Sequence, residues 1–516
     1  MNFNKMQEEI KINLNPKIPP IPKYEDKTKI NVRYMVIAPY VSIHVFWDNE
    51  KSELVYEVEE PLLSEQNKIN FKKIEEVLKE TINFTLTEEN KPVDSLIDYI
   101  NKHTKKVIAE LGMKISEEDY KKIFYYLYRN FIGLNEIEPI MKDYFIEDVE
   151  CNGANEPIYV VHRVFRNLRT NIRFKEIDPL ASFVEKLAQK TGKYVSYASP
   201  ILDGTLPDGS RVNATYTKDI SSKGPTFTIR KFTKVPWTPI QLIGFNTLNA
   251  EILAYFWMSL QYQTNIMIVG GTASGKTTLL NAVAFFIPQE NRVVSIEDTR
   301  ELNLPRENWL PSVVRTGVSG GQVGEVDMFS LLRGSFRQNP DYVIVGEVRG
   351  AEASVLFQGM ASGHASISTL HADSVQAIIN RLSTPPINLS PTLINGLDIV
   401  AIQTHAIVKG EETRKVREIV EIIKVNPDGT YTTNTPFRWD PAQDKFFFQG
   451  KSFVFQKISE KIGIPIDKLI KEYQIRTQLI SQLYNQKVLS YDDVQRVINE
   501  YAKNPESVLR RFSIQS

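Results

Sequence analysis

The chain has 516 residues, which at roughly 150 residues per domain predicts about three domains. It is 42% hydrophobic and 24% charged, as ordinary soluble globular proteins are, and 62 Lys and Arg balance 62 Asp and Glu. The zero net charge excludes bulk cationic attraction to nucleic acid as the main driving force, and the single cysteine, Cys151, excludes an intramolecular disulfide and a cysteine-based structural zinc site.

The first 23 residues are expected to form a flexible amino-terminal segment. They lack the apolar region of a secretory signal, and the chain has no run of about 20 apolar residues, so we expect a cytosolic protein. Helical spacing predicts a docking helix over residues 3–14, and the prolines of residues 15–23 predict an extended tether. A frayed tail is the alternative. The apolar residues at this spacing are Phe3, Met6, Ile10 and Leu14.

Residues 24–115 are expected to form a small α+β domain. Strands are expected at 34–45 and 54–58, and helices at 74–82 and 96–111. His44 and His103 are interpreted as structural or surface residues, because neither has a second metal ligand at suitable spacing.

Residues 116–235 are expected to form a second α+β unit. Its expected elements are a helix in EEDYKKIFYYLYRNFIG, a strand at 158–165, a helix near 180–191, a hairpin over 202–216 and a strand at 225–232. The proline-bracketed residues 236–241 predict a hinge. A third unit is expected at 242–430. Residues 431–516 are expected to form a helical C-terminal subdomain that begins with polar loops and continues with helices in ISEKIGIPIDKLIKEYQIRTQLISQLYNQ and SYDDVQRVINEYAK.

The third unit contains a glycine-rich loop between a buried strand and a helix, in NIMIVGGTASGKTTLLNAV. The loop satisfies the pattern GxxxxGK[ST], whose backbone N–H groups surround phosphates at a helix N-terminus. Lys276 is expected to bind the β- and γ-phosphates and Thr277 to bind Mg²⁺. We therefore predict an ATP or GTP site formed by these residues: Gly270, Gly271, Thr272, Ala273, Ser274, Gly275, Lys276, Thr277 and Thr278.

Carboxylates follow two further apolar strands of this unit. Glu347 follows the strand at 342–345, and Glu297 follows the strand at 293–296. Acids at the carboxyl ends of such strands lie beside the phosphates in an open α/β sheet, where they hold the Mg²⁺ shell or orient the attacking water. A helix cap or loop residue is the alternative for either acid.

Two histidines, His364 and His371, lie in the segment ASGHASISTLHADS (361–374). The residues between them favour a strand or turn over a continuous helix, and a metal pair would need a third ligand, which the sequence does not offer. We interpret both as groups that sense the γ-phosphate by hydrogen bonding. Two buried structural histidines are the alternative.

Four segments, taken in order, closely resemble the motifs of the secretion-type ATPases of type II secretion, type IV pili and archaella. GGTASGKTT, VSIEDTREL, RQNPDYVIVGEVRGAEA and SGHASISTLHA correspond to that family's Walker A loop, Asp box, Walker B motif and His box. Residues 116–235 also resemble its amino-terminal module, through NGANEPIYVVH, LPDGSRV and PTFTIRKF. Within the family the chain looks most like the archaeal branch and closest to the archaellum motor ATPase. The segments that suggest this likeness are GGTASGKTT, SIEDTREL, GEVRG and RWDPAQD.

The resemblance implies an α/β fold with a RecA-like P-loop ATPase domain. Two small α+β units would precede this domain, and a helical C-terminal extension would follow it. The resemblance also implies a ring, usually a hexamer, with ATP bound between the second and third units. Glu297 would polarise the attacking water and Glu347 would hold the Mg²⁺ shell, although these two roles could be exchanged.

Arginines of the matched segments are the candidates for neutralising transition-state charge. Arg211 lies in LPDGSRV and Arg230 in FTIRKF, and ordinary surface residues are the alternative for both. Arg337 and Arg349, on either side of the Walker B motif, are further candidates.

Three positions differ from patterns found in related enzymes. The bacterial members carry a four-cysteine zinc module, which a chain with one cysteine cannot form. Ala273 stands where many relatives have Gly, and its methyl group should be tolerated if φ there is negative. Gly346 stands where other P-loop enzymes have Asp, as it does in this family, which leaves Glu347 as the acid.

We expect a homohexameric ATPase that drives assembly and rotation of the archaellum through a polytopic membrane platform protein, with cytosolic regulatory partners. The chain would be cytoplasmic and recruited to the inner face of the cell membrane. An archaeal pilus-assembly or type II secretion ATPase is the near alternative. A nucleic-acid translocase is the distant one, against which stand the neutral charge and the absence of a long basic stripe, so no nucleic acid is expected as a partner.

Overall fold

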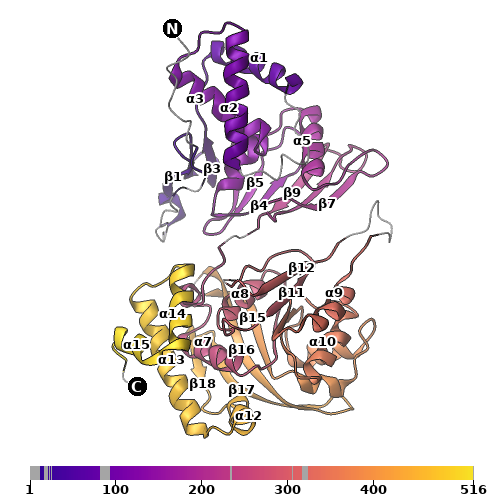
Figure 1. Ribbon diagram of the computed structural model, residues 1–516, viewed down its shortest axis with the longest axis vertical. Helices are drawn as coiled ribbons and strands as arrows, with labels where there is room; N and C mark the ends of the chain where they lie inside the picture. Colours follow the sequence, from indigo (N-terminus) through magenta and orange to yellow (C-terminus); the bar gives the residue numbers. More distant parts are fainter. Residues whose placement is uncertain are drawn as a thin grey trace. The chain divides into compact units, whose positions relative to one another are not determined.

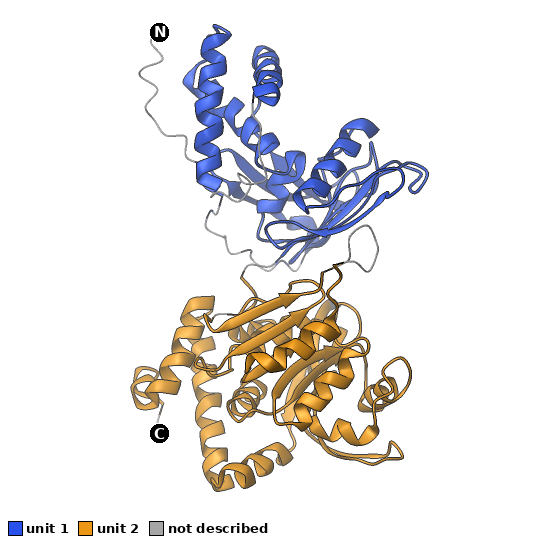
Figure 2. Cartoon of the chain, turned by 45° about the vertical axis from the view of Figure 1, so that its right-hand side comes forward, with its two compact units in different colours: residues 1–232 blue, residues 233–516 orange. Residues whose placement is uncertain are grey.

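The chain forms two compact units, residues 1–232 and residues 233–516, which Figure 2 colours separately. The computed structural model describes residues 12–14, 16, 21, 24, 26–81, 93–232, 235–304, 306–315, 324–408 and 410–514. Each hydrophobic core of these residues lies wholly within one unit. Among the described helices, none combines the length and the apolar character that crossing a membrane requires.

Unit 1 is built on one nine-stranded sheet (Figure 1). Its strands are β1 (Asn31–Ile37), β2 (Val41–Asp48), β3 (Glu53–Glu59), β4 (Ile146–Cys151), β5 (Tyr159–His162), β6 (Arg166–Thr170), β7 (Ile201–Thr205), β8 (Arg211–Thr215) and β9 (Thr226–Arg230). They lie in the order β1-β2-β3-β6-β5-β4-β9-β8-β7, antiparallel except for the pair β3 and β6.

The division expected between residues 115 and 116 does not separate two sheets. Strand β3 comes from the first expected unit and β6 from the second, and the two pair with Tyr56 opposite Thr170. The Asn171 side chain extends this pairing, because it bonds both the N–H and the carbonyl of Val58. The two expected α+β units therefore share one sheet.

The helices of unit 1 are α1 (Glu65–Thr81), α2 (Val93–Glu110), α3 (Glu117–Phe131), α4 (Glu138–Lys142) and α5 (Ile177–Lys190). Helices α1, α2 and α3 pack on one another through a core of their own. Helix α3 begins where the Ser116 hydroxyl accepts the N–H of Asp119 and where acids in the first turn complement the helix dipole. Its Tyr125 belongs to the core of the sheet.

The expected docking helix over residues 3–14 lies mostly outside the described residues, as does most of the expected tether over 15–23. Its last part is described and is not helical: Asn13 forms a β-bridge with Ala38, and the Asn13 N–H donates to the Ala38 carbonyl at 3.0 Å. The helix therefore does not extend to residue 14.

Unit 2 is built on a second nine-stranded sheet. Its strands are β10 (Ile266–Gly270), β11 (Val293–Glu297), β12 (Trp309–Val313), β13 (Tyr342–Val345), β14 (Ala365–Leu370), β15 (Ile399–Val408), β16 (Glu411–Val425), β17 (Tyr431–Asp440) and β18 (Lys445–Phe448). The order is β12-β11-β13-β14-β10-β15-β16-β17-β18, parallel from β12 to β15 and antiparallel beyond. Pro311 is tolerated in β12 because this strand lies at the sheet edge.

Helices cover both faces of the parallel strands, which explains why β10, β11, β13 and β14 are buried along their whole length (Figure 1). One face packs against α7 (Ala250–Gln261), α8 (Lys276–Ala284), α12 (Phe453–Ile462), α13 (Ile466–Asn485), α14 (Tyr491–Lys503) and α15 (Pro505–Arg511). The other packs against α9 (Met328–Ser335), α10 (Glu352–Ala361) and α11 (Val375–Ser383). The α/β fold expected from the sequence is confirmed.

Two expected segments differ in detail from the structure. Helix α6 (Pro239–Gly244) begins inside the expected hinge at 236–241, and the Thr238 side chain caps it and donates to the Leu489 carbonyl at 3.3 Å. The end of this segment is therefore anchored in unit 2. The expected helical subdomain over 431–516 starts with strands β17 and β18, and its helices begin only at Phe453.

Candidate nucleotide site

The glycine-rich loop connects the buried strand β10 to the first turn of α8, as the sequence predicts. Two of its glycines are required by the path of the chain. A Cβ on Gly270 would lie 2.5 Å from both the Gln403 carbonyl oxygen and Ser274 Oγ, and Gly275 has φ of 93°. The backbone thus turns tightly into α8, whose N-terminal N–H groups and dipole favour an anion.

Ala273, in the middle of this loop, has φ of 56°. The condition under which its methyl group would be tolerated without cost, a negative φ, is therefore not met. A Cβ in the left-handed region approaches the following carbonyl oxygen and costs about 1–2 kcal/mol. The loop holds this strained conformation, and the Arg414 side chain donates from Nε to the Ala273 carbonyl at 3.0 Å.

Lys276 is 8% exposed at the start of α8. Its Nζ donates to the carbonyls of Gly270 at 3.1 Å and Gly271 at 2.8 Å, and lies 3.5 Å from Nδ1 of His371. Burial lowers the pKa of the Lys276 ammonium, while the Glu347 and Glu301 carboxylates oppose that shift. An ammonium held over the loop in this way suits phosphate oxygens.

Glu297 ends strand β11 and is 2% exposed. Its Oε1 accepts the N–H groups of Glu301 at 2.8 Å and Leu302 at 2.9 Å, while its Oε2 is buried with no hydrogen-bond partner among the described residues. Burial raises the pKa of this carboxyl to about 7, against the two backbone hydrogen bonds, which lower it. Such a group exchanges a proton near neutral pH.

Gly346 makes room for this carboxyl. A Cβ on Gly346 would lie 3.1 Å from Cγ of Glu297, closer than most real contacts. An aspartate here, as in other P-loop enzymes, would bring a second carboxylate against Glu297. The acid of this strand is therefore Glu347, one residue later.

Glu347 differs from Glu297 in its surroundings. Its Oε2 accepts from Arg349 at 2.8 Å, and its Oε1 lies 3.3 Å from Nε2 of His371. Burial raises the pKa of Glu347, but the hydrogen bond and charge of Arg349, with His371 and Lys276, outweigh it and leave the pKa below its ordinary value. Glu347 is therefore an ionised carboxylate, a hard oxygen ligand of the kind Mg²⁺ prefers.

Thr277 and Thr278 follow Lys276 in the first turn of α8, and both are half-buried. The hydroxyl of Thr277 is the second hard oxygen that this part of the site offers to a cation. The residues present thus fit a Mg²⁺ ion bound beside the phosphates.

The two histidines of the predicted pair lie at opposite ends of β14. His371 follows the carboxyl end, contacts Lys276 and Glu347, and has a pKa lowered by burial and by the Lys276 charge. His364 precedes the amino end, one strand length of about 20 Å away at the usual rise per residue, and its ring packs edge-on against Phe336 at 4.8 Å. The structure therefore does not bring His364 to the phosphate loop.

The four candidate arginines are placed in three locations. Arg211 and Arg230 are directly opposite each other on β8 and β9 in unit 1. Arg211 pairs with Asp203 at 3.0 Å and Arg230 with Asp148 at 3.3 Å.

The other two candidates belong to unit 2. Arg337 lies before the amino end of β13, away from the phosphate loop, whereas Arg349 contacts both Glu347 and, at 3.8 Å, Asp298. Arg349 is thus part of the acidic network at the carboxyl edge.

Two residues that touch the loop were not predicted from the sequence. Gln403 on β15 lies opposite Gly270 in the sheet, and its buried Oε1 has no hydrogen-bond partner among the described residues. Arg414 on β16 binds Ala273. Neither lies in a recognisable motif, because only the pairing of β15 with β10 and β16 brings them to the loop.

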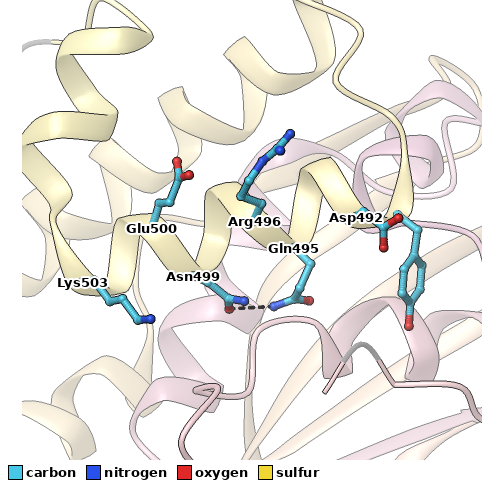
Figure 3. Close-up of a pocket in the computed structure, with 7 residues that line it drawn as sticks. Asp492, Gln495, Arg496, Asn499, Glu500 and Lys503 are labelled. Atoms are coloured by element: carbon cyan, nitrogen blue, oxygen red, sulfur yellow. Dashed lines mark hydrogen bonds between the residues drawn. The ribbon is translucent and has the colours of Figure 1, made fainter. Parts of the chain in front are cut away.

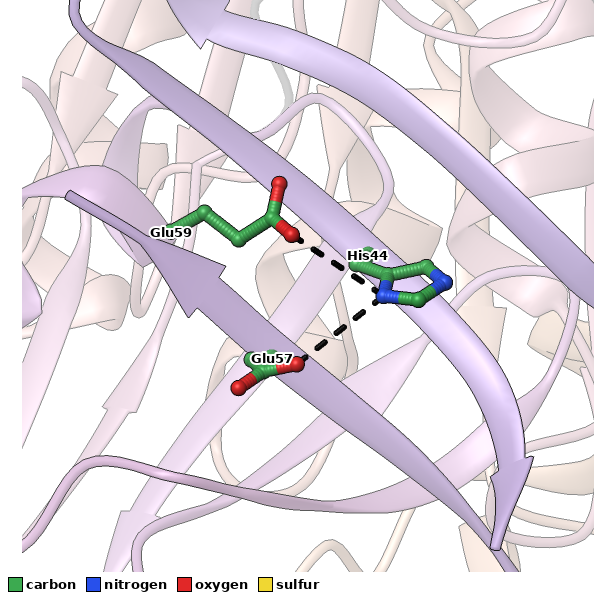
Figure 4. Close-up of side chains that lie close together, drawn as sticks. All are labelled: His44, Glu57 and Glu59. Carbon is green, nitrogen blue, oxygen red and sulfur yellow. Dashed lines mark ion pairs between the residues drawn. The ribbon is translucent and has the colours of Figure 1, made fainter.

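Two other features of the described chain lie on elements that carry no residue of this site. A pocket along α14 is lined by Tyr491, Asp492, Gln495, Arg496, Asn499, Glu500 and Lys503 (Figure 3). On β2 and β3, ligand atoms of His44, Glu57 and Glu59 lie within 4.8 Å of one another (Figure 4). Arg33 donates to Glu59 at 2.7 Å and lies 3.4 Å from His44 Nδ1, so this cluster already contains a cation.

A model of the family described as Type II/IV secretion system protein matches residues 133–421. Uncharacterized protein MJ0900 of Methanocaldococcus jannaschii is 36% identical over 491 residues, which cover 91% of this chain and 88% of that protein. Type IV secretion system protein PtlH of Bordetella pertussis is 31% identical over 229 residues, which cover 40% of this chain and 67% of PtlH. The solved structure of the Legionella pneumophila ATPase DotB aligns with 69% of this chain and 92% of its own, at 16% identity and a TM-score of 0.39.

Proposed function

Because the chain belongs to the type II/IV secretion system protein family and is an ATP hydrolase of that family, we propose that it drives assembly and rotation of the archaellum through a membrane platform protein. The ATP-hydrolysing part of this proposal is carried by one observation: His371 contacts both Lys276 and Glu347 beside the glycine-rich loop. The archaellum part is supported by the resemblance of GGTASGKTT, SIEDTREL, GEVRG and RWDPAQD to the archaellum motor ATPase.

Glu297 is proposed as the group that polarises the attacking water. Its buried Oε2 has no hydrogen-bond partner among the described residues and could accept a hydrogen bond from the water. A pKa of about 7 suits a base that works at neutral pH. Glu347 is proposed to hold the Mg²⁺ shell together with Thr277, because it is ionised before any metal arrives. When bound, Mg²⁺ neutralises charge on the phosphate oxygens. This division of roles is the one that the two different environments favour.

The remaining site residues are proposed to act on the phosphates. Lys276 would bind the β- and γ-phosphates, and His371, which contacts it, would respond to the γ-phosphate by hydrogen bonding. Arg211 and Arg230 would neutralise transition-state charge, for which each must leave its carboxylate partner.

The assembly is proposed to be a homohexameric ring that works in the cytoplasm at the inner face of the cell membrane, where it contacts the platform protein and cytosolic regulatory partners. A pilus-assembly or type II secretion role of archaeal type is the second candidate, and the match to the family described as Type II/IV secretion system protein supports the secretion role.

Lys276→Ala tests the nucleotide site. The variant loses a charge that the loop carbonyls hold over the phosphates, so we expect its kcat/KM for ATP to fall by about 10²–10³-fold or more. Release of phosphate by the purified protein measures this. Lys503→Ala removes an exposed lysine of α14 and is the matched control, expected to hydrolyse ATP at the normal rate. An unchanged rate in Lys276→Ala would overturn the site.

The same substitution in the host tests the filament. We expect cells carrying Lys276→Ala to lose swimming and archaella while retaining other pili, scored by motility assay and electron microscopy. Intact swimming with missing pili would move the protein to the pilus-assembly role and leave the ATPase chemistry standing.

A further inference from the structure

A strained residue in the phosphate loop is bonded to a side chain from a distant strand. Ala273 has φ of 56°, a left-handed conformation that a residue with a Cβ rarely adopts. The Arg414 guanidinium donates from Nε to the Ala273 carbonyl at 3.0 Å, across 141 positions of sequence. We propose that Arg414 is a positioning residue that keeps the loop in its nucleotide-receiving conformation by holding the Ala273 carbonyl away from the phosphates.

The strands β15 and β16 bring Arg414 to the loop as part of a continuous backing surface. Gly270, the last residue of β10, lies opposite Gln403 of β15, and its missing side chain leaves the room that the Gln403 carbonyl occupies. A Cβ on Gly275 would lie 3.2 Å from both Arg414 Cδ and Gln403 Oε1. The loop is therefore packed against these two strands at both of its ends.

The direction of the Ala273 carbonyl decides what the loop presents to an anion. In a peptide unit the C=O and N–H point in opposite directions, so a rotated carbonyl would turn its negative end toward the phosphates. Alanine disfavours the left-handed conformation, and a glycine would adopt it without this cost. A charged donor on the carbonyl stabilises the strained conformation, since hydrogen bonds from charged groups are stronger than neutral ones.

This inference rests on the proposed nucleotide site, but it predicts a change in nucleotide affinity rather than a loss of hydrolysis. If Arg414 prepares the loop before nucleotide arrives, its removal should weaken nucleotide binding and leave the chemical step nearly unchanged. If the strain at Ala273 is what Arg414 offsets, a glycine at position 273 should make Arg414 largely unnecessary.

The test is a double-mutant cycle in the full-length protein with Arg414→Gln, Ala273→Gly and the two combined. Binding of a fluorescent ADP analogue gives Kd, and steady-state hydrolysis gives KM and kcat. We expect Arg414→Gln to raise Kd and KM about tenfold, which corresponds to one strained residue, with kcat within about twofold. In the Ala273→Gly background the same substitution should raise Kd by no more than about threefold.

The controls separate this inference from the site itself. Arg438→Gln removes an exposed arginine of the neighbouring strand β17 and should leave Kd unchanged. If Lys276→Ala still binds nucleotide and hydrolyses ATP, the proposed site fails as a whole. The site stands if Lys276→Ala loses hydrolysis. If Arg414→Gln then raises Kd equally with Ala273 and with Gly at position 273, or changes only kcat, Arg414 does not act through the loop. Thermal unfolding of each variant identifies any loss of the fold.

Discussion

Glu297 and Glu347 are two glutamates at the ends of adjacent strands, and their surroundings shift the pKa values of their carboxyls in opposite directions. Glu297 is buried with one oxygen unpartnered, and its pKa rises to about 7. Glu347 is half-exposed beside Arg349, His371 and Lys276, and its pKa falls below the ordinary value despite its partial burial. A base and a metal ligand need these opposite properties, so the two environments support the division of roles proposed above, which the sequence leaves open.

The raised pKa of Glu297 predicts a pH dependence for hydrolysis. A base must be deprotonated to act, so kcat/KM for ATP should rise as pH passes through about 7 and level off above it. Glu297→Gln should remove this rise and lower the rate by about 10²–10⁴-fold. A pH–rate profile of both proteins measures this, and a wild-type profile that stays flat through neutral pH would contradict it.

The stability of the nucleotide-free protein provides a second readout of the same carboxyl. The folded pKa of about 7 lies above that of an unfolded glutamate, so the folded state binds the proton more tightly. The resulting stabilisation is fully present at acid pH and is lost as pH rises through about 7. The free energy of unfolding should therefore fall with pH in the wild type relative to Glu297→Gln, by on the order of 3 kcal/mol.

At the scale of single residues, the sequence predicts the site residues that lie in motifs and misses those that only strand pairing brings to the site. The glycine-rich loop, Glu297, Glu347 and His371 come together as expected, because each follows a strand of one parallel sheet. His364 does not, because the strand that the sequence suggests between the two histidines separates them. The positive φ at Ala273 has no signal in the local sequence, and the side chain that bonds its carbonyl, Arg414, comes from β16, 141 positions later.

A single carboxylate, Glu421 of β16, joins the sheet of unit 2 to the C-terminal helices. It is fully buried, and its oxygens accept hydrogen bonds from five donors: Tyr255 Oη at 2.8 Å, Asn434 Nδ2 at 2.7 Å, Ser452 Oγ at 2.6 Å, Phe453 N at 2.7 Å and Val454 N at 3.3 Å. The last three belong to the start of α12. The carboxylate therefore satisfies N–H groups that a helix start leaves open and complements its dipole.

Glu421→Ala should destabilise unit 2 by about 3 kcal/mol or more, because it leaves several buried donors without an acceptor. Glu421→Gln, which retains one acceptor oxygen, should cost less. Thermal and denaturant unfolding measure both. Glu460→Ala, which removes an exposed glutamate of α12, is the matched control and should change stability little. Equal stability of Glu421→Ala and Glu460→Ala would show that this carboxylate does not anchor the helix.

Elements with strong local signals are predicted well, and strands with weak local signals are not. The helix expected near 180–191 forms as α5 over Ile177–Lys190, where its apolar positions recur on one face. Strands β17 and β18 lie at the start of residues 431–516, where polar loops are expected before the helices, and they form by hairpin pairing with β16 and with each other. Their own sequence gives a weaker signal than the helices that follow.

At the scale of the whole molecule, the cores divide the chain more clearly than its composition does. The sequence suggests four successive structured parts, whereas contacts define two units, residues 1–232 and 233–516. The parallel pair of β3 with β6 merges the first two parts, and the sheet that continues from β15 into β18 merges the last two. The first merger depends on pairing between residues more than 100 positions apart, whereas the second runs through consecutive hairpins that cross the expected boundary at residue 430.

Residues 235–514 should fold alone, since every core of this part of the described chain is built from its own residues. We expect this fragment to bind ADP with nearly the affinity of the full chain, because the glycine-rich loop and Lys276 are present. Hydrolysis should fall by about 10³-fold or more, because Arg211 and Arg230 belong to unit 1. Calorimetric titration and phosphate release measure the two. A fragment that hydrolyses ATP at the full rate would show that neither arginine is needed.

The contact between Gly346 and Glu297 limits how such an enzyme can evolve. An aspartate at position 346 would press a second carboxylate against a base whose pKa is already raised, and the like charge would raise it further. A single substitution that moved the acid from position 347 to position 346 would therefore also disturb Glu297 at the end of β11. The two positions are therefore coupled through space, and a side chain at position 346 should be tolerated only together with a smaller residue at position 297.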